Sequence, residues 1–237
     1  MCANADTSVM AWHSLLPPSK RRLIHDDGSV DEVMFKAHFI MHAYTIEMHR
    51  PLSTLAYSPI ESVARCAPLA PSDRLRCPNR AESELHTVKC LSAIHTLDQL
   101  LTLPTDLNTH SPFLICMIAN ATIAHLSACR FLHQGEKLAT SREKIRLTMG
   151  TLKRLGEYWP LGKRTYHELG IIAREILCLT SDSGPAPANM TTTVPHPENP
   201  SVNFVSPDSL FDGNLDFGAL LDIQSPSLLG VMQLSAG

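Results

Sequence analysis

The segment from 111 to 179 constrains the fold most, because three consecutive stretches in it carry the spacing of packed helices. Ser111-Pro112 offers a side-chain acceptor followed by a residue with a fixed φ, a pair that starts helices. The almost wholly apolar run after it predicts a helix that ends near Leu132. A helix apolar on nearly every side is one that others surround, so the run indicates a helical core.

Two amphipathic helices are predicted next, each from a capping box: Thr140-x-x-Glu143 and Thr165-x-x-Glu168. Gly156 and Pro160 mark the end of the first of them. In both, apolar residues recur three or four positions apart and define one buried face. These residues are Ile145, Met149, Leu152 and Leu155 in the first helix, and Leu169, Ile172, Ala173, Ile176 and Leu177 in the second.

Two further helices are predicted before residue 111. Asp31 caps the first, which ends at Arg50 because the residue before a proline avoids the helical region. The second runs from Glu82 to Leu103 and is apolar on more than one side, so we expect it to pack against two neighbours. The proline-rich stretch 51–81 between them predicts a connection with at most a short helical turn. With 5% aromatic residues and few strand-like runs, the sequence predicts an all-α fold, either a helical bundle or an irregular α-helical array.

Composition divides the chain into three parts. Residues 1–30 hold Pro17-Pro18 and Asp26-Asp27-Gly28, so we expect a flexible leader. Residues 31–180 form the helical domain. Residues 181–237 hold seven of the 17 prolines and predict a disordered tail, because such a segment cannot bury enough surface to offset its ordering entropy.

Large apolar side chains alternate with aspartates within this tail, from Leu210 to Ile223. The tail carries six acidic residues and no Lys or Arg. Such alternation is typical of activation segments, which bind a groove on a partner protein. The alternative is a terminal segment that docks on its own helical body. The predicted partner-binding residues are Phe211, Leu215, Phe217, Leu220 and Leu221.

The net charge and the cysteines indicate which partners the chain binds and in which cellular compartment it works. A net charge of -3 and a pI near 6.4 argue against a chain that neutralises DNA phosphates. The N-terminus lacks the features of a secretory signal, and the run 113–129 is too short and too polar in places to span a membrane. We therefore expect free thiols in a reducing compartment at all seven cysteines, which are Cys2, Cys66, Cys77, Cys90, Cys116, Cys129 and Cys178.

Short motifs in the helical part carry a resemblance to a known family. They are His49-Arg50-Pro51-Leu52-Ser53, His110-Ser111-Pro112-Phe113, Ala124-His125-Leu126-Ser127, Lys144-Ile145-Arg146-Leu147 and Leu155-Gly156-Glu157-Tyr158-Trp159-Pro160-Leu161. In their order and spacing they resemble the regulatory region of fungal-specific transcription factors, which lies C-terminal to a zinc binuclear cluster. The resemblance covers roughly residues 30–180. It implies a nuclear regulator, often of a secondary-metabolite gene cluster.

The zinc cluster that defines this family is missing from the sequence. It begins C-x2-C-x6-C, whereas no two cysteines here are closer than 11 positions. No residue therefore inherits a zinc-ligand role, and we expect no direct sequence-specific DNA binding by this chain. The partners of this chain would be the transcription machinery or a DNA-bound regulator. The chain is either a complete protein or a truncated form of a longer one. Lys20-Arg21-Arg22 is a short basic cluster that either serves nuclear import or is a solvated charge run.

Two groups of side chains, one of histidines and one of aspartates, are candidate metal sites. His38, His42 and His49 share one helical face, but only the first two are close enough to share a metal ion, and a packing role is favoured. The cluster Asp26, Asp27 and Asp31 offers carboxylates that suit magnesium, as in all-α terpene cyclases, and supports the alternative of an all-α enzyme or small-molecule binder. No second metal motif accompanies it. The sequence thus predicts a non-catalytic regulator with no cofactor, metal ligand or catalytic residue.

Overall fold

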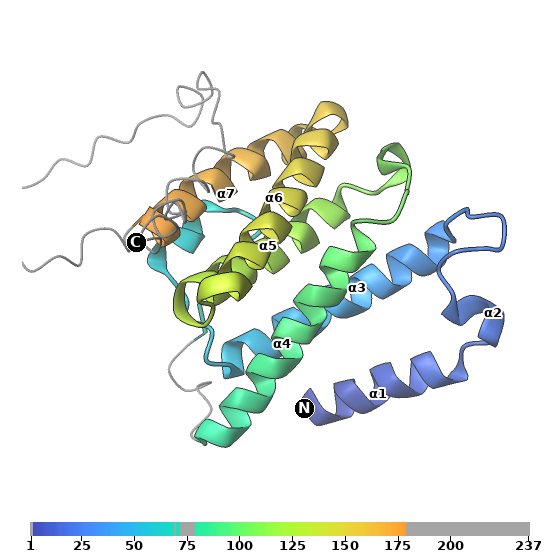
Figure 1. Cartoon of the computed structure of the whole chain (residues 1–237), viewed down its shortest axis with the longest axis horizontal. Helices are drawn as coiled ribbons and strands as arrows, with labels where there is room; N and C mark the ends of the chain where they lie inside the picture. The colour runs from blue at the N-terminus through green and yellow to red at the C-terminus, as the bar shows by residue number, and fades with distance from the viewer. Residues whose placement is uncertain (1, 69, 72–78, 179–237) are drawn as a thin grey trace, which may run out of the picture.

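The computed structural model describes residues 2–68, 70–71 and 79–178, and this part of the chain is α-helical (Figure 1). The predicted all-α class is confirmed. Within these residues, seven α-helices and three short 3-10 helices follow one another. They are α1 (Cys2–Leu15), α2 (Pro18–Arg21), α3 (Glu32–His49), η1 (Arg50–Leu52), η2 (Pro59–Val63), α4 (Arg80–Leu100), η4 (Leu107–Thr109), α5 (Phe113–Phe131), α6 (Gly135–Tyr158) and α7 (Pro160–Cys178).

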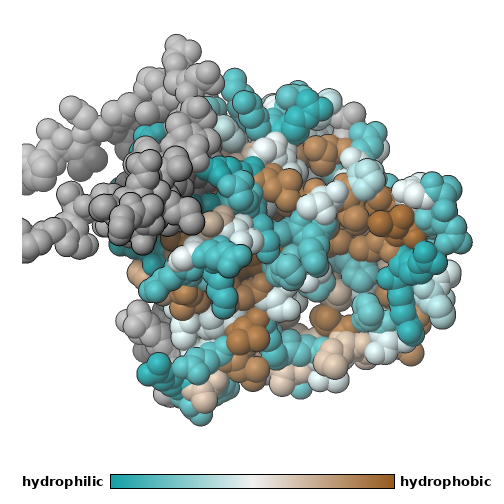
Figure 2. All heavy atoms as spheres, in the orientation of Figure 1, coloured by the Kyte–Doolittle hydropathy of each residue, from teal (hydrophilic) through white to brown (hydrophobic). Residues whose placement is uncertain are grey.

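Helix α5 is the centre of the fold and contacts α3, α4, α6 and α7. Four of its buried residues are alanines, whose small side chains let neighbouring helices approach closely; they are Ala119, Ala121, Ala124 and Ala128. By length and composition α5 alone among the described helices would pass for a membrane span, but 83% of its apolar window is buried. The prediction of a buried core helix is confirmed. On the face drawn in Figure 2, hydrophobic residues fall in patches between hydrophilic ones.

The predicted cap at Asp31 is confirmed, and the two predicted capping boxes at Thr140 and Thr165 are wrong. Asp31 Oδ1 accepts a hydrogen bond from Met34 N at 3.1 Å at the start of α3. By contrast, α6 begins at Gly135 and α7 at Pro160, so Thr140 and Thr165 lie inside these helices. Glu168 bonds Arg164 and the backbone of Arg65 instead of closing a box. The predicted buried faces of both helices are nevertheless confirmed.

Helix α4 packs against α3 and α5, as its pattern predicts. Two of its apolar residues, Leu85 and Val88, are nevertheless exposed. The stretch from 51 to 81 is a connection in which the described residues form only the short helices η1 and η2, as expected.

Residues 1–30 contain a helix that the sequence analysis did not expect. Helix α1 has no buried residue, yet it contacts α3. Asp6 forms an ion pair with Lys89 of α4 and lies 2.8 Å from His49 Nε2 of α3. Partial burial alone would raise the pKa of Asp6, but hydrogen bonds from Lys89 and His49 outweigh it and hold this pKa below its ordinary value. The leader is therefore helical and attached, not loose.

Two glycines set the sharp turn between α6 and α7. A Cβ at Gly162 would lie 2.7 Å from the backbone nitrogen of Gly156, and a Cβ at Gly156 would lie 2.8 Å from Lys163 N. Both distances are shorter than any real Cβ contact, and the atoms in the way are backbone atoms that cannot rotate aside. The family-like run around Gly156 therefore has a packing role here.

We predict opposite effects of alanine at two glycines of similar helical setting. Gly162→Ala should lower the free energy of unfolding by about 1–3 kcal/mol, because the new Cβ forces the helices apart. Gly150→Ala should raise it by about 0.5–1 kcal/mol, since a Cβ there has no atom within 4 Å and alanine favours helix. Urea unfolding of both variants measures the difference. Equal effects of the two substitutions would contradict the close approach.

Candidate functional site

The candidate site lies where α3 ends, at the motif His49-Arg50-Pro51-Leu52-Ser53. Arg50 is only 2% exposed, and its Nη2 atom lies 2.8 Å from Glu61 Oε1 in a buried ion pair. Its guanidinium carbon also lies 4.0 Å from the centre of the Tyr57 ring, within cation–π range. Arg50 therefore holds the following loop, residues 53–58, against the end of α3.

Glu61 in turn fixes the start of η2. Its Oε1 atom accepts a hydrogen bond from Ser58 N at 2.9 Å, which completes the capping box of this short helix. The loop is tied to the core as well, because Ser127 of α5 donates to the carbonyl of Ala56 at 2.9 Å. These bonds make the loop a fixed element and not a mobile one.

His49, the first residue of the motif, is fully buried between two polar partners. Its Nδ1 atom lies 2.6 Å from His86 Nδ1 of α4, and its Nε2 atom lies 2.8 Å from Asp6 Oδ1 of α1. One pair of tautomers satisfies both contacts: His49 donates through Nε2 and accepts at Nδ1 from His86. Burial lowers the pKa of His86, and the neighbouring His49 and Lys89 lower it further. The motif thus joins three helices.

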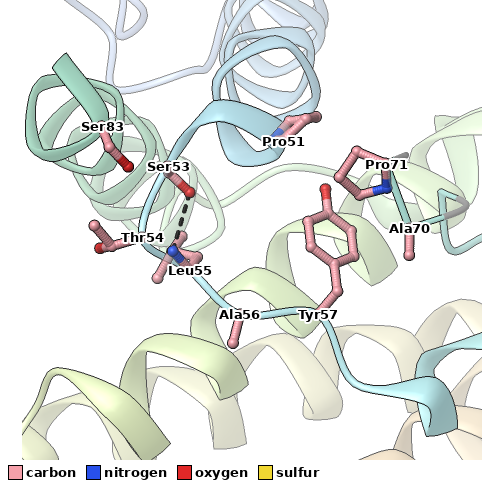
Figure 3. Close-up of a pocket in the computed structure, with 9 residues that line it drawn as sticks. All are labelled: Pro51, Ser53, Thr54, Leu55, Ala56, Tyr57, Ala70, Pro71 and Ser83. Carbon is pink, nitrogen blue, oxygen red and sulfur yellow. Dashed lines mark hydrogen bonds between the residues drawn. The ribbon is translucent and has the colours of Figure 1, made fainter. Parts of the chain in front are cut away.

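A pocket of about 460 Å³ opens beside this loop (Figure 3). Its described lining comes from η1, the loop, the start of α4 and the 70–71 stretch, and consists of Pro51, Ser53, Thr54, Leu55, Ala56, Tyr57, Ala70, Pro71 and Ser83. The Tyr57 ring points toward Pro71 in Figure 3. The volume of the pocket falls within the range of small-molecule sites. The lining offers hydroxyls and apolar carbon but no carboxylate or imidazole, so these residues suit binding better than acid–base chemistry.

The acidic cluster of the alternative enzyme hypothesis does not form a site. Asp31 caps α3 and pairs with Lys20 at 2.6 Å, while Asp26 lies 3.2 Å from Arg22. Asp27 accepts hydrogen bonds from the backbone and hydroxyl of Ser29, and these lower the pKa of its carboxyl. Each carboxylate is used by its own turn, so the three do not converge on a magnesium ion.

The histidines of α3 do not form a metal site together either. The His38 and His42 rings stack with centres 6.4 Å apart, and Trp12 of α1 packs edge-on against His38. His49 is engaged in the separate contact with His86 and Asp6. Burial lowers the pKa of His42 to about 4, with nearby His38 and His13 adding to the effect. These neutral rings pack α1 onto α3, which agrees with the packing role favoured from the sequence.

The expectation of seven free cysteines is wrong at two of them. Cys66, which follows η2, forms a disulfide with Cys116 in the first turn of α5, and their Cα atoms lie 4.9 Å apart. The connection 51–68 brings Cys66 back onto the core. Because Cys66 and Cys116 are 50 residues apart, the sequence does not reveal this pairing. Cys2, Cys90 and Cys129 are free thiols. Burial raises the pKa of the Cys90 thiol to about 12, so this thiol is unreactive.

The predicted partner-binding residues of the tail lie outside the described residues. Phe211, Leu215, Phe217, Leu220 and Leu221 all belong to the segment 179–237. The residues that the sequence analysis missed are Glu61 and Tyr57, which surround Arg50. Only the family-like motif around Arg50 pointed to this place.

Comparison with known proteins gives one informative similarity. Over 167 residues the chain is 32% identical to a protein named C6 finger domain transcription factor iacK, from Pestalotiopsis fici. The chain is related to fungal transcription factors. The match covers 70% of this chain but only 24% of the relative, so the chain spans about a quarter of that protein. No known family profile matches the chain, and no solved structure does.

This relationship supports a transcription regulator. The similarity to a transcription factor agrees with the family resemblance that the motif at Arg50 and the run at the α6–α7 turn carry. In this structure both motifs hold helices together, and neither exposes a catalytic group.

Proposed function

We propose that this chain is a non-catalytic transcription regulator that works in the nucleus through protein contacts. The similarity to a C6 finger transcription factor is the observation that carries the proposal. The fixed, tightly bonded helical body supports it, because such a body suits the presentation of surfaces to partners. Its targets would be the genes of a fungal secondary-metabolite cluster, as the resemblance implies.

DNA reading would come from a segment or partner other than these 237 residues. The closest cysteines, Cys66 and Cys77, are 11 positions apart, so the C-x2-C-x6-C spacing of a zinc cluster does not occur in this sequence. The net charge of -3 also does not favour phosphate binding. The regulator would therefore reach its genes through a DNA-bound partner or through a zinc cluster on another segment of a longer chain.

The segment 181–237 would recruit the transcription machinery. Its six acidic residues and absence of Lys and Arg keep the apolar side chains between 210 and 223 solvated until a partner groove accepts them. Phe217, Leu220 and Leu221 fall on one face of a short helix that would form on binding. This mode needs no preformed pocket in the helical body.

A reporter assay tests the proposal. The full chain is fused to an unrelated DNA-binding domain, and we expect reporter output well above that of the bare domain. Replacing Phe217, Leu220 and Leu221 by alanine should return output to the bare-domain level, because the apolar anchors are lost. The matched control replaces Leu228 and Leu229, which lie in the same tail outside the aspartate alternation, and should keep full output. Equal losses in both variants, or no activation by the full chain, would overturn the proposal.

The alternative of an all-α enzyme or small-molecule binder using Asp26, Asp27 and Asp31 has less support. These carboxylates are engaged in local turns and ion pairs. The relative is a transcription factor, which favours a non-enzyme. Alanine at Asp26 and Asp27, with asparagine at Asp31 to keep the acceptor that caps α3, should therefore leave reporter output unchanged.

A further inference from the structure

Two histidines and a cysteine come together at the C-terminal end of α5. His125 and Cys129 are one helical turn apart, and His133 lies in the turn that leads into α6. One ring nitrogen of each histidine and the Cys129 Sγ atom all lie within 4.8 Å of one another. His125 and Cys129 are buried, and His133 is partly exposed. The cluster is thus closed toward the core and open toward solvent.

The donor set of this cluster is the one that zinc prefers. Imidazole nitrogen and thiolate sulfur bind Zn²⁺ at about 2.0–2.1 and 2.3 Å, and catalytic or exchangeable sites often have three protein ligands and a water. Tetrahedral binding needs ligand atoms roughly 3.3–3.6 Å apart, so the three groups must close by about 1 Å. His133 lies beyond the last turn of α5, where a small backbone shift is easiest.

A buried, ion-paired carboxylate beside His125 supports the assignment. Asp98 of α4 is 4% exposed, and its Oδ2 atom faces both His125 and Lys144. This atom lies 3.9 Å from His125 Nδ1 and 3.6 Å from Lys144 Nζ. Carboxylates that face the second nitrogen of a metal-bound histidine orient the ring and strengthen the ligand. On the other side, Ser141 of α6 holds His133 through a 2.7 Å contact with Nδ1.

Metal binding requires neutral imidazoles and a thiolate. Burial lowers the pKa of His125 to about 3, with His133 and Lys144 adding to the effect, and burial likewise lowers the pKa of His133. Burial raises the pKa of the Cys129 thiol to about 12, so an ion must displace the thiol proton into solvent. The carboxylate of Asp98 offsets part of the positive charge that the ion and Lys144 bring together.

We propose that His125, Cys129 and His133 form a zinc site, with Asp98 orienting His125 and solvent completing the coordination. The site differs from the zinc cluster of the related transcription factors, since it needs one cysteine and lies inside the helical body. Bound zinc would tie the end of α5 to the turn that leads into α6, with α4 contributing Asp98 beside His125. The sequence analysis assigned no metal ligand to this chain, so the proposal departs from it, and it does not depend on the regulatory function.

Metal titration of the purified full chain tests the site. In oxygen-free buffer without added reductant, which leaves the Cys66–Cys116 disulfide intact, Co²⁺ should bind one equivalent and give the charge-transfer absorption of a thiolate ligand, and Zn²⁺ should then displace it. His133→Gln should abolish this absorption while circular dichroism stays unchanged, because His133 lies in a partly exposed turn. Asp98→Asn should weaken zinc binding about 10–100-fold.

The control is His25→Gln, which removes an exposed histidine far from the cluster in sequence and should leave one equivalent bound. Absence of the charge-transfer absorption in the unaltered chain would overturn the proposal. So would metal binding that persists in His133→Gln with unchanged affinity, because other histidines would then hold the ion.

Discussion

Replacing Arg50 by alanine should lower the free energy of unfolding by about 3–5 kcal/mol. The guanidinium is 2% exposed, and Glu61, its ion-pair partner, is 3% exposed. Removing one member of such a pair leaves the other as an uncompensated buried charge, which costs far more than the pair contributes when intact. The alanine also removes the stacking contact with Tyr57. Urea unfolding followed by circular dichroism measures the change.

The matched control is Arg154→Ala. Arg154 pairs with Glu157 at 3.0 Å on the surface of α6, and both side chains are at least half exposed. Its loss should change the free energy of unfolding by about 0–1 kcal/mol, as is usual for surface pairs. If the Arg50 and Arg154 variants were destabilised equally, the buried pair would not have the role assigned to it.

A double substitution separates charge from packing. Arg50→Met with Glu61→Leu removes both charges and keeps apolar volume, so it should recover part of the stability that Arg50→Ala loses. Recovery should be incomplete, because Glu61 also accepts the hydrogen bond from Ser58 N that caps η2. Full recovery would show that this cap contributes little.

The helices with an apolar stripe were predictable from the sequence, and some of their ends were not. The buried faces of α6 and α7 follow from spacing alone, because an apolar stripe is recognised from residues only three and four positions apart in the sequence. The pattern Thr-x-x-Glu fits a helix interior as well as a helix start. At Thr165 the hydroxyl lies against the core beside Cys66 and Glu168 bonds elsewhere, so tertiary contacts decided the boundary.

The polar contacts were not predictable, because they join residues far apart in the chain. Asp6 meets His49 across 43 positions, and this contact attaches a helix that buries none of its own residues. Such a helix has no apolar stripe to reveal it. The candidate zinc ligands had a visible signal, since His125, Cys129 and His133 recur every four residues. What the sequence could not supply is Asp98, which reaches the cluster from another helix.

Acidification from pH 7.5 to 5 should lower the free energy of unfolding by about 2–4 kcal/mol. The main cause is His125, whose burial lowers its pKa to about 3, with His133 and Lys144 adding to the effect. The unfolded chain takes up a proton near pH 6.5, whereas the folded chain does not, so stability is complete above about pH 7 and falls as the pH drops toward 3. His125 alone accounts for about 2 kcal/mol at pH 5, and the less buried His42 adds a smaller share.

Asp98 acts in the opposite direction. Its burial raises the pKa of this carboxyl to about 6, although Lys144 lowers it in part. The folded chain therefore binds a proton at Asp98 between about pH 6 and 4 that the unfolded chain does not, and this offsets about 1 kcal/mol of the loss at pH 5. The net effect of acidification remains destabilising. Burial lowers the pKa of more histidines, such as His125 and His42, than the number of carboxylates whose pKa it raises, such as Asp98.

Two variants with opposite effects on the pH profile test this account. His125→Gln should flatten the fall of stability between pH 6.5 and 5 by up to about 1.4 kcal/mol per pH unit, which corresponds to one proton. Asp98→Asn should steepen it, because the opposing proton uptake is lost. The measurements are made with a chelator present, so that no metal ion competes for the imidazoles. Exposed His25→Gln is the control, and profiles of parallel shape for His125→Gln and the unaltered chain would contradict the assignment to His125.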